Sequence, residues 1–155
     1  MNALEAYIDP GSLPATEAGR LAQLLKLGDA ERLDDVALAR RVRAGLPTSS
    51  VSALEKILGV RLTAGRLASE ATLRRHRRRR TPLSRSHSER AYELGRVVDA
   101  VACAFRGDVT RIEAFLTRPH PLLDGESPLD MATSCSAGAD SVLNLVRRAE
   151  AGVAV

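Results

Sequence analysis

The fold class is decided by residues 86–105, SHSERAYELGRVVDAVACAF. Apolar side chains recur there at steps of three and four residues, at Ala91, Leu94, Val98, Val101 and Phe105. That spacing places them on one face of an α-helix. Ser86 and Glu89 precede the pattern at the spacing of a capping box, in which the serine caps the first turn. The stretch therefore predicts a long helix that faces a core.

Similar patterns predict helices on both sides of this stretch. We expect helices over about residues 16–28, 34–45, 48–59 and 137–151, after Asp108 and Ser127, and two short helices within residues 60–80 capped by Thr63 and Ser69. The inward positions expected in the second and the last of these helices are Val36, Ala39 and Val42, and Val142, Leu145, Val146 and Ala149. No run alternates apolar and polar residues for long enough to form a half-buried strand. The sequence thus predicts an all-α protein.

The positive charge of the chain is concentrated in one short run. The 155 residues carry a formal charge of +4, and residues 74–80 contain six arginines. Without these six, 17 basic residues stand against 19 acidic ones, and no acidic residue lies between Ala71 and Ser88. Solvated protein surfaces usually mix charges of both signs. The run therefore predicts a surface that binds a polyanion.

The residue types of this run favour DNA as the polyanion. Arginine side chains make paired contacts with phosphate and with guanine edges. Proteins that bind single-stranded RNA stack bases on aromatic side chains, and no aromatic residue lies between Tyr7 and Tyr92. RNA stays the alternative, and duplex DNA is the prediction.

Residues 60–80 have the pattern of a helix-turn-helix, a motif that presents its second helix to DNA. In a helix that begins near Ser69, Leu73 would face the core, while polar and basic residues would point away from it. The residues predicted to bind DNA are Ser69, Thr72, Arg74, Arg75, Arg77, Arg78 and Arg79. A helix-turn-helix reads a palindrome best as a dimer, so we expect a homodimer or a larger assembly.

The domain organisation predicted from these elements has three parts. Residues 1–15 are expected to form a flexible arm, and residues 16–82 a helical DNA-binding domain. Thr81 and Pro82 break the helical pattern before a polar connector, which places the domain boundary there. Residues 83–155 are expected to form a second, small helical domain.

Motifs for metal binding, nucleotide binding or catalysis are not found in the sequence. The three histidines do not combine with Cys103, Cys135 or carboxylates at zinc-binding spacing, and the chain has no glycine-rich phosphate loop. We therefore expect no metal, no cofactor and no enzymatic activity. The chain also lacks a signal-peptide pattern and an apolar run of 18 residues, which predicts a cytoplasmic protein with reduced cysteines and no membrane contact.

Several motifs from about residue 44 to the end occur in the order typical of one protein family. They are Arg43-Ala-Gly-Leu-Pro47, Thr72-Leu-Arg-Arg75, Leu83 with Ser88-Glu-Arg90, Phe105, Phe115-Leu-x-x-Pro119, Leu123-x-Gly-x-Ser-Pro-Leu-Asp130 and Glu150-x-Gly152. In this order they resemble the Xre/MbcA/ParS antitoxins, and the motifs after Leu123 resemble the toxin-binding domain of that family. One departure is a shorter connection before Thr72.

The resemblance implies a function with two partners. An antitoxin of this kind blocks the active site of a RES-domain toxin that consumes NAD, and it represses the shared operon through an N-terminal Xre-type helix-turn-helix that binds operator DNA. The residues that the resemblance predicts to contact the toxin are Arg147, Arg148, Glu150, Gly152, Val153, Ala154 and Val155. The carboxylate of Val155 is a candidate plug for a toxin site that accepts NAD. The alternative is a stand-alone basic helix-turn-helix regulator without a toxin partner.

Overall fold

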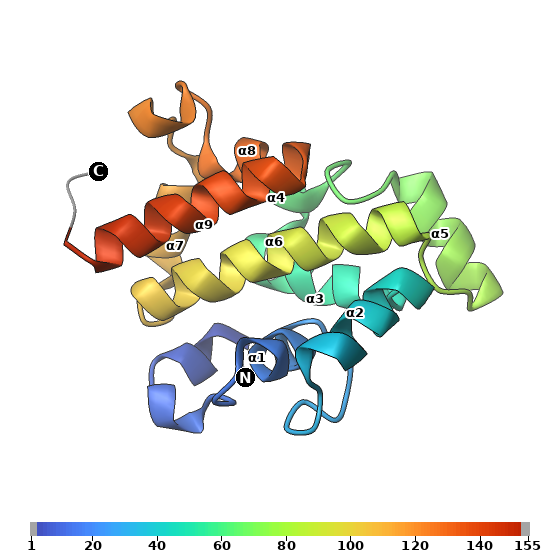
Figure 1. Ribbon diagram of the computed structural model, residues 1–155. Helices are drawn as coiled ribbons and strands as arrows, with labels where there is room; N and C mark the ends of the chain where they lie inside the picture. The colour runs from blue at the N-terminus through green and yellow to red at the C-terminus, as the bar shows by residue number, and fades with distance from the viewer. Residues whose placement is uncertain (1–2, 153–155) are drawn as a thin grey trace. The chain divides into compact units, whose positions relative to one another are not determined.

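The fold is all-helical, as predicted. In the computed structural model, which describes residues 3–152, every regular element is a helix (Figure 1). The α-helices are α1 (Glu17–Leu24), α2 (Asp35–Ala44), α3 (Thr48–Leu58), α4 (Val60–Thr63), α5 (Glu70–Arg79), α6 (Arg85–Ala104), α7 (Val109–Thr117), α8 (Pro128–Ser134) and α9 (Ser136–Glu150). The 3-10 turns are η1 (Ala3–Tyr7), η2 (Pro10–Ser12) and η3 (Pro121–Leu123). Among these, no helix is long and apolar enough to cross a membrane.

The described chain forms two compact units. One, the middle unit, contains residues 14–95, and the other, the terminal unit, combines residues 3–13 with residues 96–152. The division between the units falls inside α6, which is one continuous helix. The division into domains at residues 16–82 and 83–155 is a prediction about which parts of the chain fold independently. It stays a prediction.

In the middle unit, α1 and α3 are joined by buried side chains and by one buried hydrogen bond. Leu21 of α1, Leu25 at the C-cap of α1 and Leu54 of α3 are almost completely buried. Ser50 of α3 is buried too, and its hydroxyl donates a hydrogen bond of 2.6 Å to the carbonyl of Leu25. Because a buried hydroxyl without a partner is costly, this bond fixes α3 against the end of α1. The unit therefore provides α3 as a fixed support for the segments that follow it.

Three local expectations in α2 and α4 are wrong. Helix α2 buries Leu38 and Val42, an i, i+4 pair, whereas Val36 is 60 % exposed and Ala39 is exposed too, because steps of three residues drift around a helix with 3.6 residues per turn. Thr63 does not cap a helix. It ends α4, and its buried hydroxyl donates to the carbonyl of Gly59 at 3.1 Å.

The start of α6 differs from the predicted capping box at Ser86 and Glu89. The side chain of Ser84 accepts the hydrogen bond from the backbone N–H of His87 at 3.1 Å, so Ser84 caps the first turn. Glu89 instead pairs with Arg85 at 2.9 Å, one turn away on the same helix. The sequence has a serine at residues 84, 86 and 88, and in the folded chain Ser84 makes the capping hydrogen bond.

In the terminal unit, α7, α8 and α9 pack around buried leucines and valines. Asp108 and Ser127 cap α7 and α8, as predicted. Helix α9 buries Val142, Leu145 and Val146 as expected, but Ala149 is exposed. The packing of α9 on α8 requires Gly138, because a Cβ atom at this position would lie 2.1 Å from the carbonyl oxygen of Met131. The two helices therefore meet backbone to backbone.

Residues 3–13 lie within the segment 1–15 that the sequence predicts to be a flexible arm, and the flexibility of this segment stays a prediction. They form η1 and η2, and Leu4 and Tyr7 are buried in the terminal unit. Residues 1–2 lie outside the described residues. Leu4 and Tyr7 lie three residues apart and therefore share one face of a helical turn, but the segment is too short to show a periodic pattern in the sequence.

Candidate functional site

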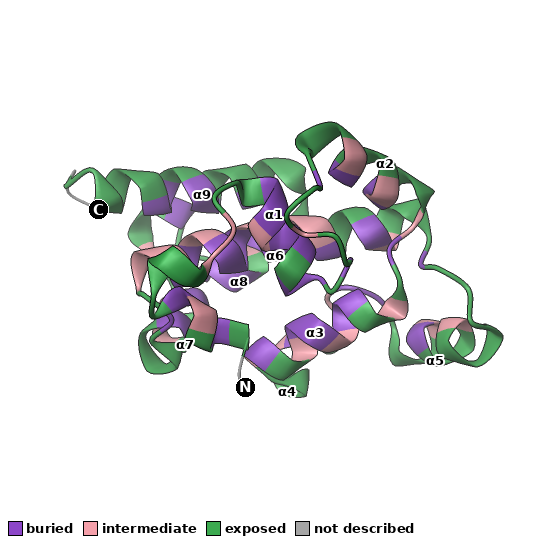
Figure 2. Ribbon diagram, turned by 90° about the horizontal axis from the view of Figure 1, so that it is seen from below, coloured by how far each residue is buried: buried purple, intermediate pink, exposed green. Residues whose placement is uncertain are grey.

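The basic helix α5 begins where the sequence predicts. Ser69 is its N-cap, with the side-chain oxygen accepting a hydrogen bond from the backbone N–H of Thr72 at 3.1 Å. The Ser69 hydroxyl in turn donates to Oγ1 of Thr72 at 2.8 Å. Leu73 is the buried residue of α5, and the rest of the helix is mainly exposed (Figure 2). The predicted DNA-binding residues Ser69 and Thr72 therefore lie at the helix start, where they are part of its cap.

Three arginines of α5 are exposed and uncompensated. The side chains of Arg75, Arg78 and Arg79 form no hydrogen bond or ion pair with any residue in the described range 3–152. Arg74 pairs with Glu70 at 3.3 Å, but the two side chains are 66 % and 88 % exposed, so this ion pair contributes little. Spacings of three and four residues place Arg75 and Arg78, and Arg74 and Arg78, near each other on the outward face.

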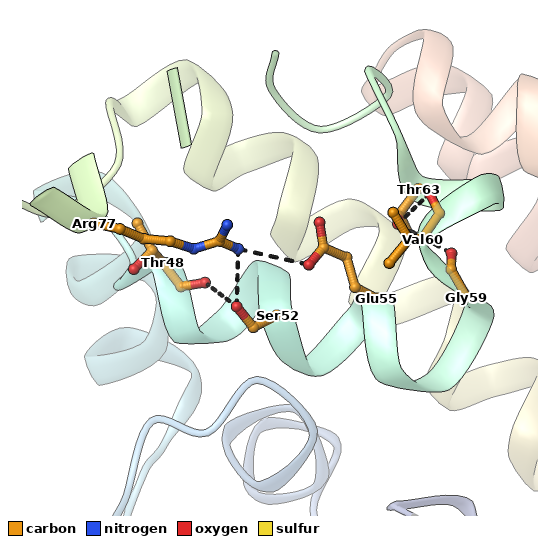
Figure 3. A network of polar contacts seen from close by, with 7 residues as sticks. All are labelled: Thr48, Ser52, Glu55, Gly59, Val60, Thr63 and Arg77. Atoms are coloured by element: carbon orange, nitrogen blue, oxygen red, sulfur yellow. Dashed lines mark hydrogen bonds and ion pairs between the residues drawn. The ribbon is translucent and has the colours of Figure 1, made fainter. Parts of the chain in front are cut away.

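Arg77 has a different role from its neighbours. Its side chain reaches back to α3, where it donates a hydrogen bond of 3.0 Å to the hydroxyl of Ser52 and lies 3.6 Å from the carboxylate of Glu55 (Figure 3). The hydroxyl of Ser52 donates to the carbonyl of Thr48. Arg77 therefore connects α5 to α3, and Glu55 compensates its charge. These partners lie more than 20 residues away in the sequence, and no local pattern indicates them.

Helix α3 is the element that supports α5. Helix α4, the other short helix of the predicted helix-turn-helix, is a single turn of four residues, and residues 64–69 connect it to α5. The contacts of α5 with α3 include the Arg77 bonds described above. The assignment of α4 and α5 to an Xre-type helix-turn-helix stays a prediction.

The end of α5 is closed by a left-handed residue. Arg80 has φ of 53°, and its N–H donates to the carbonyl of Arg77 while the N–H of Thr81 donates to that of His76. This pair of bonds is a Schellman motif, which usually has glycine at the position of Arg80. A shallow hollow of about 470 Å³ lies beside it, and its lining includes Thr48, Arg77 and Arg80.

Replacing Arg80 with glycine should stabilise the chain by about 1 kcal/mol, because glycine adopts the left-handed conformation without a Cβ clash. The matched control is Arg79→Gly, which removes the same charge one residue earlier, inside the helix, and should destabilise the chain by about 1 kcal/mol. Thermal unfolding of the two variants measures the difference. Equal melting temperatures would contradict the strain at Arg80.

His87 lies beside the basic helix without adding to its charge. Burial, together with Arg90, His76 and Arg75, lowers the pKa of His87 below its usual range. The neutral imidazole is therefore the form present at pH 7, where the outward arginines of α5 carry the positive charge of this surface.

The two units carry opposite net charges. The middle unit has 17 basic and nine acidic residues, a net charge of +8, whereas the terminal unit has six basic and ten acidic residues, a net charge of −4. The overall +4 of the chain therefore conceals a basic unit and an acidic one. A phosphate backbone is attracted to the first and repelled by the second.

The predicted toxin-binding residues lie at the end of α9 and beyond. Arg147, Arg148 and Glu150 are exposed in the last turn, and Arg147 donates to the side-chain carbonyl of Asn144 at 3.3 Å. Gly152 follows with φ of 74°. The predicted contacts at Val153, Ala154 and Val155 lie outside the described residues.

Comparison with known proteins identifies this part of the chain. Residues 98–152 match the family model described as the antitoxin Xre/MbcA/ParS C-terminal toxin-binding domain. The C-terminal third of the chain therefore resembles the toxin-binding domain of this antitoxin family, and residues 98–152 are called the toxin-binding domain from here on. No curated protein matches the chain. The toxin-binding domain begins inside α6, contains α7, α8 and α9, and ends at Gly152.

The two cysteines of the toxin-binding domain are free thiols, as predicted. Cys135 caps α9, with its sulfur 3.4 Å from the backbone nitrogen of Gly138 and 3.7 Å from the hydroxyl of Ser134. The hydrogen bond from Gly138 and that from Ser134 lower the pKa of the Cys135 thiol. The role visible in the structure is that of a helix cap.

Proposed function

We propose that this chain is the antitoxin of a toxin–antitoxin pair. In this proposal, the toxin-binding domain neutralises a RES-domain toxin that consumes NAD, and α5 binds operator DNA to repress the shared operon. The observation that carries the proposal is the match of residues 98–152 to an antitoxin toxin-binding domain. The chain acts by binding in the cytoplasm, as a dimer or larger assembly, and not as an enzyme.

The charge distribution supports DNA as the second partner. The outward arginines of α5 have no acidic partner in the described chain, apart from the exposed pair of Arg74 with Glu70. When arginines without an acidic partner bind phosphates, they displace the counterions condensed on the DNA. This release is the main source of affinity for a DNA backbone. Arg77 holds α5 on α3 and serves as a positioning residue, while Arg75, Arg78 and Arg79 contact phosphate or base edges.

The end of α9 is the proposed contact with the toxin. Arg147, Arg148, Glu150 and Gly152 are exposed at the end of the family match, while the preceding turns of α9 bury one face, with Val142 and Val146 on it, against the domain. A rigid helix that ends in exposed charged side chains can approach the mouth of a toxin active site without unfolding the domain that carries it. The phosphates of NAD imply basic groups in that site, which Glu150 can pair with.

The toxin half of the proposal is tested with a RES-domain toxin, to be sought first among the reading frames adjacent to the gene of this chain. Purified chain should stop NAD consumption by that toxin, and Arg148→Glu should weaken its inhibition about tenfold, because the substitution reverses a charge at the proposed contact. The matched control is Arg118→Glu, which makes the same charge change at an exposed position at the end of α7.

Two outcomes would contradict the proposal. Full inhibition by Arg148→Glu would show that the end of α9 is not the contact. A chain that leaves the toxin active, yet binds DNA from its own promoter, would instead be a stand-alone regulator.

A further inference from the structure

The N-terminal segment is held against the toxin-binding domain by buried contacts. Leu4 and Tyr7 of η1 are 1 % and 3 % exposed. The hydroxyl of Tyr7 donates a hydrogen bond of 2.8 Å to Oδ1 of Asp99 in α6, and Asp99 is itself 3 % exposed. A buried carboxylate needs such partners, because its charge is otherwise poorly solvated. The bond therefore connects two segments that lie 92 residues apart.

A second contact involves the backbone on both sides. Gly107, in the turn between α6 and α7, has φ of 71°, and a Cβ atom there would lie 2.4 Å from the carbonyl oxygen of Leu4. The same atom would lie 3.4 Å from the side chain of Ile8. Only glycine allows this approach, so the turn and η1 fit each other closely. This contact is independent of the bond between Tyr7 and Asp99.

We propose that residues 3–13 are a strap that completes the toxin-binding domain. The family match begins at residue 98 and does not contain this segment, although Asp99 and Gly107, the residues that hold it, lie inside the match. The functional domain is then discontinuous, formed by residues 3–13 with residues 96–152 and interrupted by the whole middle unit. Tyr7 is a positioning residue, which fixes α6 and the α6–α7 turn.

The strap also affects the contact with the toxin, a step that rests on the proposed function. Helix α7 follows directly from the turn at Gly107, and α8 packs on both α7 and α9. Release of the strap removes the Tyr7 hydroxyl from the buried carboxylate of Asp99. It also removes Leu4 and Ile8 from the α6–α7 turn, which is then exposed. Toxin affinity then depends on a segment at the other end of the chain.

The test uses the full chain with a protease recognition sequence inserted between Leu13 and Pro14. After cleavage, the N-terminal fragment should remain bound to the rest of the chain in size-exclusion chromatography, and toxin affinity should change less than twofold. Tyr7→Phe should increase the dissociation constant of the cleaved fragment about tenfold or more, because it removes a buried hydrogen bond to a charged group. Glu5→Gln, an exposed change in the same turn, is the control and should have no effect.

A second variant tests the other contact without altering Tyr7. Gly107→Ala should also release the fragment, and hydrogen exchange in the α6–α7 turn should accelerate in both variants. A wild-type fragment that dissociates on cleavage while toxin affinity is unchanged would overturn the strap. A chain whose fragment stays bound but which inhibits no toxin would leave the strap intact and refute the proposed function, so the two failures are distinguishable.

Discussion

Replacing Arg75 and Arg78 together with alanine should weaken binding to promoter DNA about 30-fold at 0.15 M salt. Each arginine that meets a phosphate contributes about 0.9 to the slope of log affinity against log salt concentration, which amounts to about fivefold in affinity per contact at this salt concentration. The slope should therefore fall by about 1.8 in the double variant. Fluorescence anisotropy with a duplex from the upstream region, titrated between about 0.05 and 0.3 M salt, measures both quantities.

The controls for this experiment come from arginines with other surroundings. Arg85→Ala removes a positive charge that Glu89 already compensates on α6, and it should leave the slope nearly unchanged. Arg77→Ala should reduce affinity through loss of its bonds to Ser52 and Glu55, together with a lower melting temperature. A double variant at Arg75 and Arg78 with the wild-type slope would move the DNA contact away from α5.

Replacing Gly138 with alanine should destabilise the toxin-binding domain by about 3 kcal/mol. The added Cβ would lie 2.1 Å from the carbonyl oxygen of Met131 and 2.6 Å from Oγ of Ser134. The first neighbour is backbone, so the clash is relieved only if α8 and α9 move apart. We expect the melting temperature to fall by about 6 to 12 °C and toxin inhibition to be lost at 37 °C, while binding to DNA at lower temperature persists.

Gly95→Ala is the matched control, because it makes the same change inside a helix. A Cβ atom at Gly95 would meet the side chain of Leu25 at 3.3 Å, and a flexible leucine can move by the few tenths of an ångström required. The gain in helix propensity of about 1 kcal/mol offsets that strain, so the variant should be close to neutral. A Gly138→Ala variant as stable as Gly95→Ala would contradict the close backbone packing of α8 and α9.

Local patterns in the sequence were sufficient for the helices and for several of their ends. Ser69, Asp108 and Ser127 cap their helices as predicted, because a cap is formed by residues three positions apart. The toxin-binding domain was predicted from short motifs after Leu123, and the family match confirms it. The arginine run is also evident from the sequence, because counting charges requires no knowledge of the fold.

Contacts between distant residues could not be predicted in this way. In the sequence, Arg77 does not differ from the other arginines of its run. Only in the folded chain does α3 place Ser52 and Glu55 beside it. The contact of the N-terminal segment with α6 leaves no signal in the segment itself, because the partner of Tyr7 lies 92 residues away. In both cases the energy of the contact comes from burial or charge compensation in the folded chain, and neither leaves a periodic signal in the sequence.

The pairing of residues 3–13 with residues 96–152 also sets an order for synthesis. The segment with Leu4 and Tyr7 leaves the ribosome first, and the helix that contains Asp99 follows only after the middle unit has been made. At typical rates of translation the delay is on the order of 10 s, during which the apolar segment has no partner in its own chain. The basic α5 is therefore complete before the toxin-binding domain can close, so under the proposed function the surface for DNA forms earlier than the surface for a toxin.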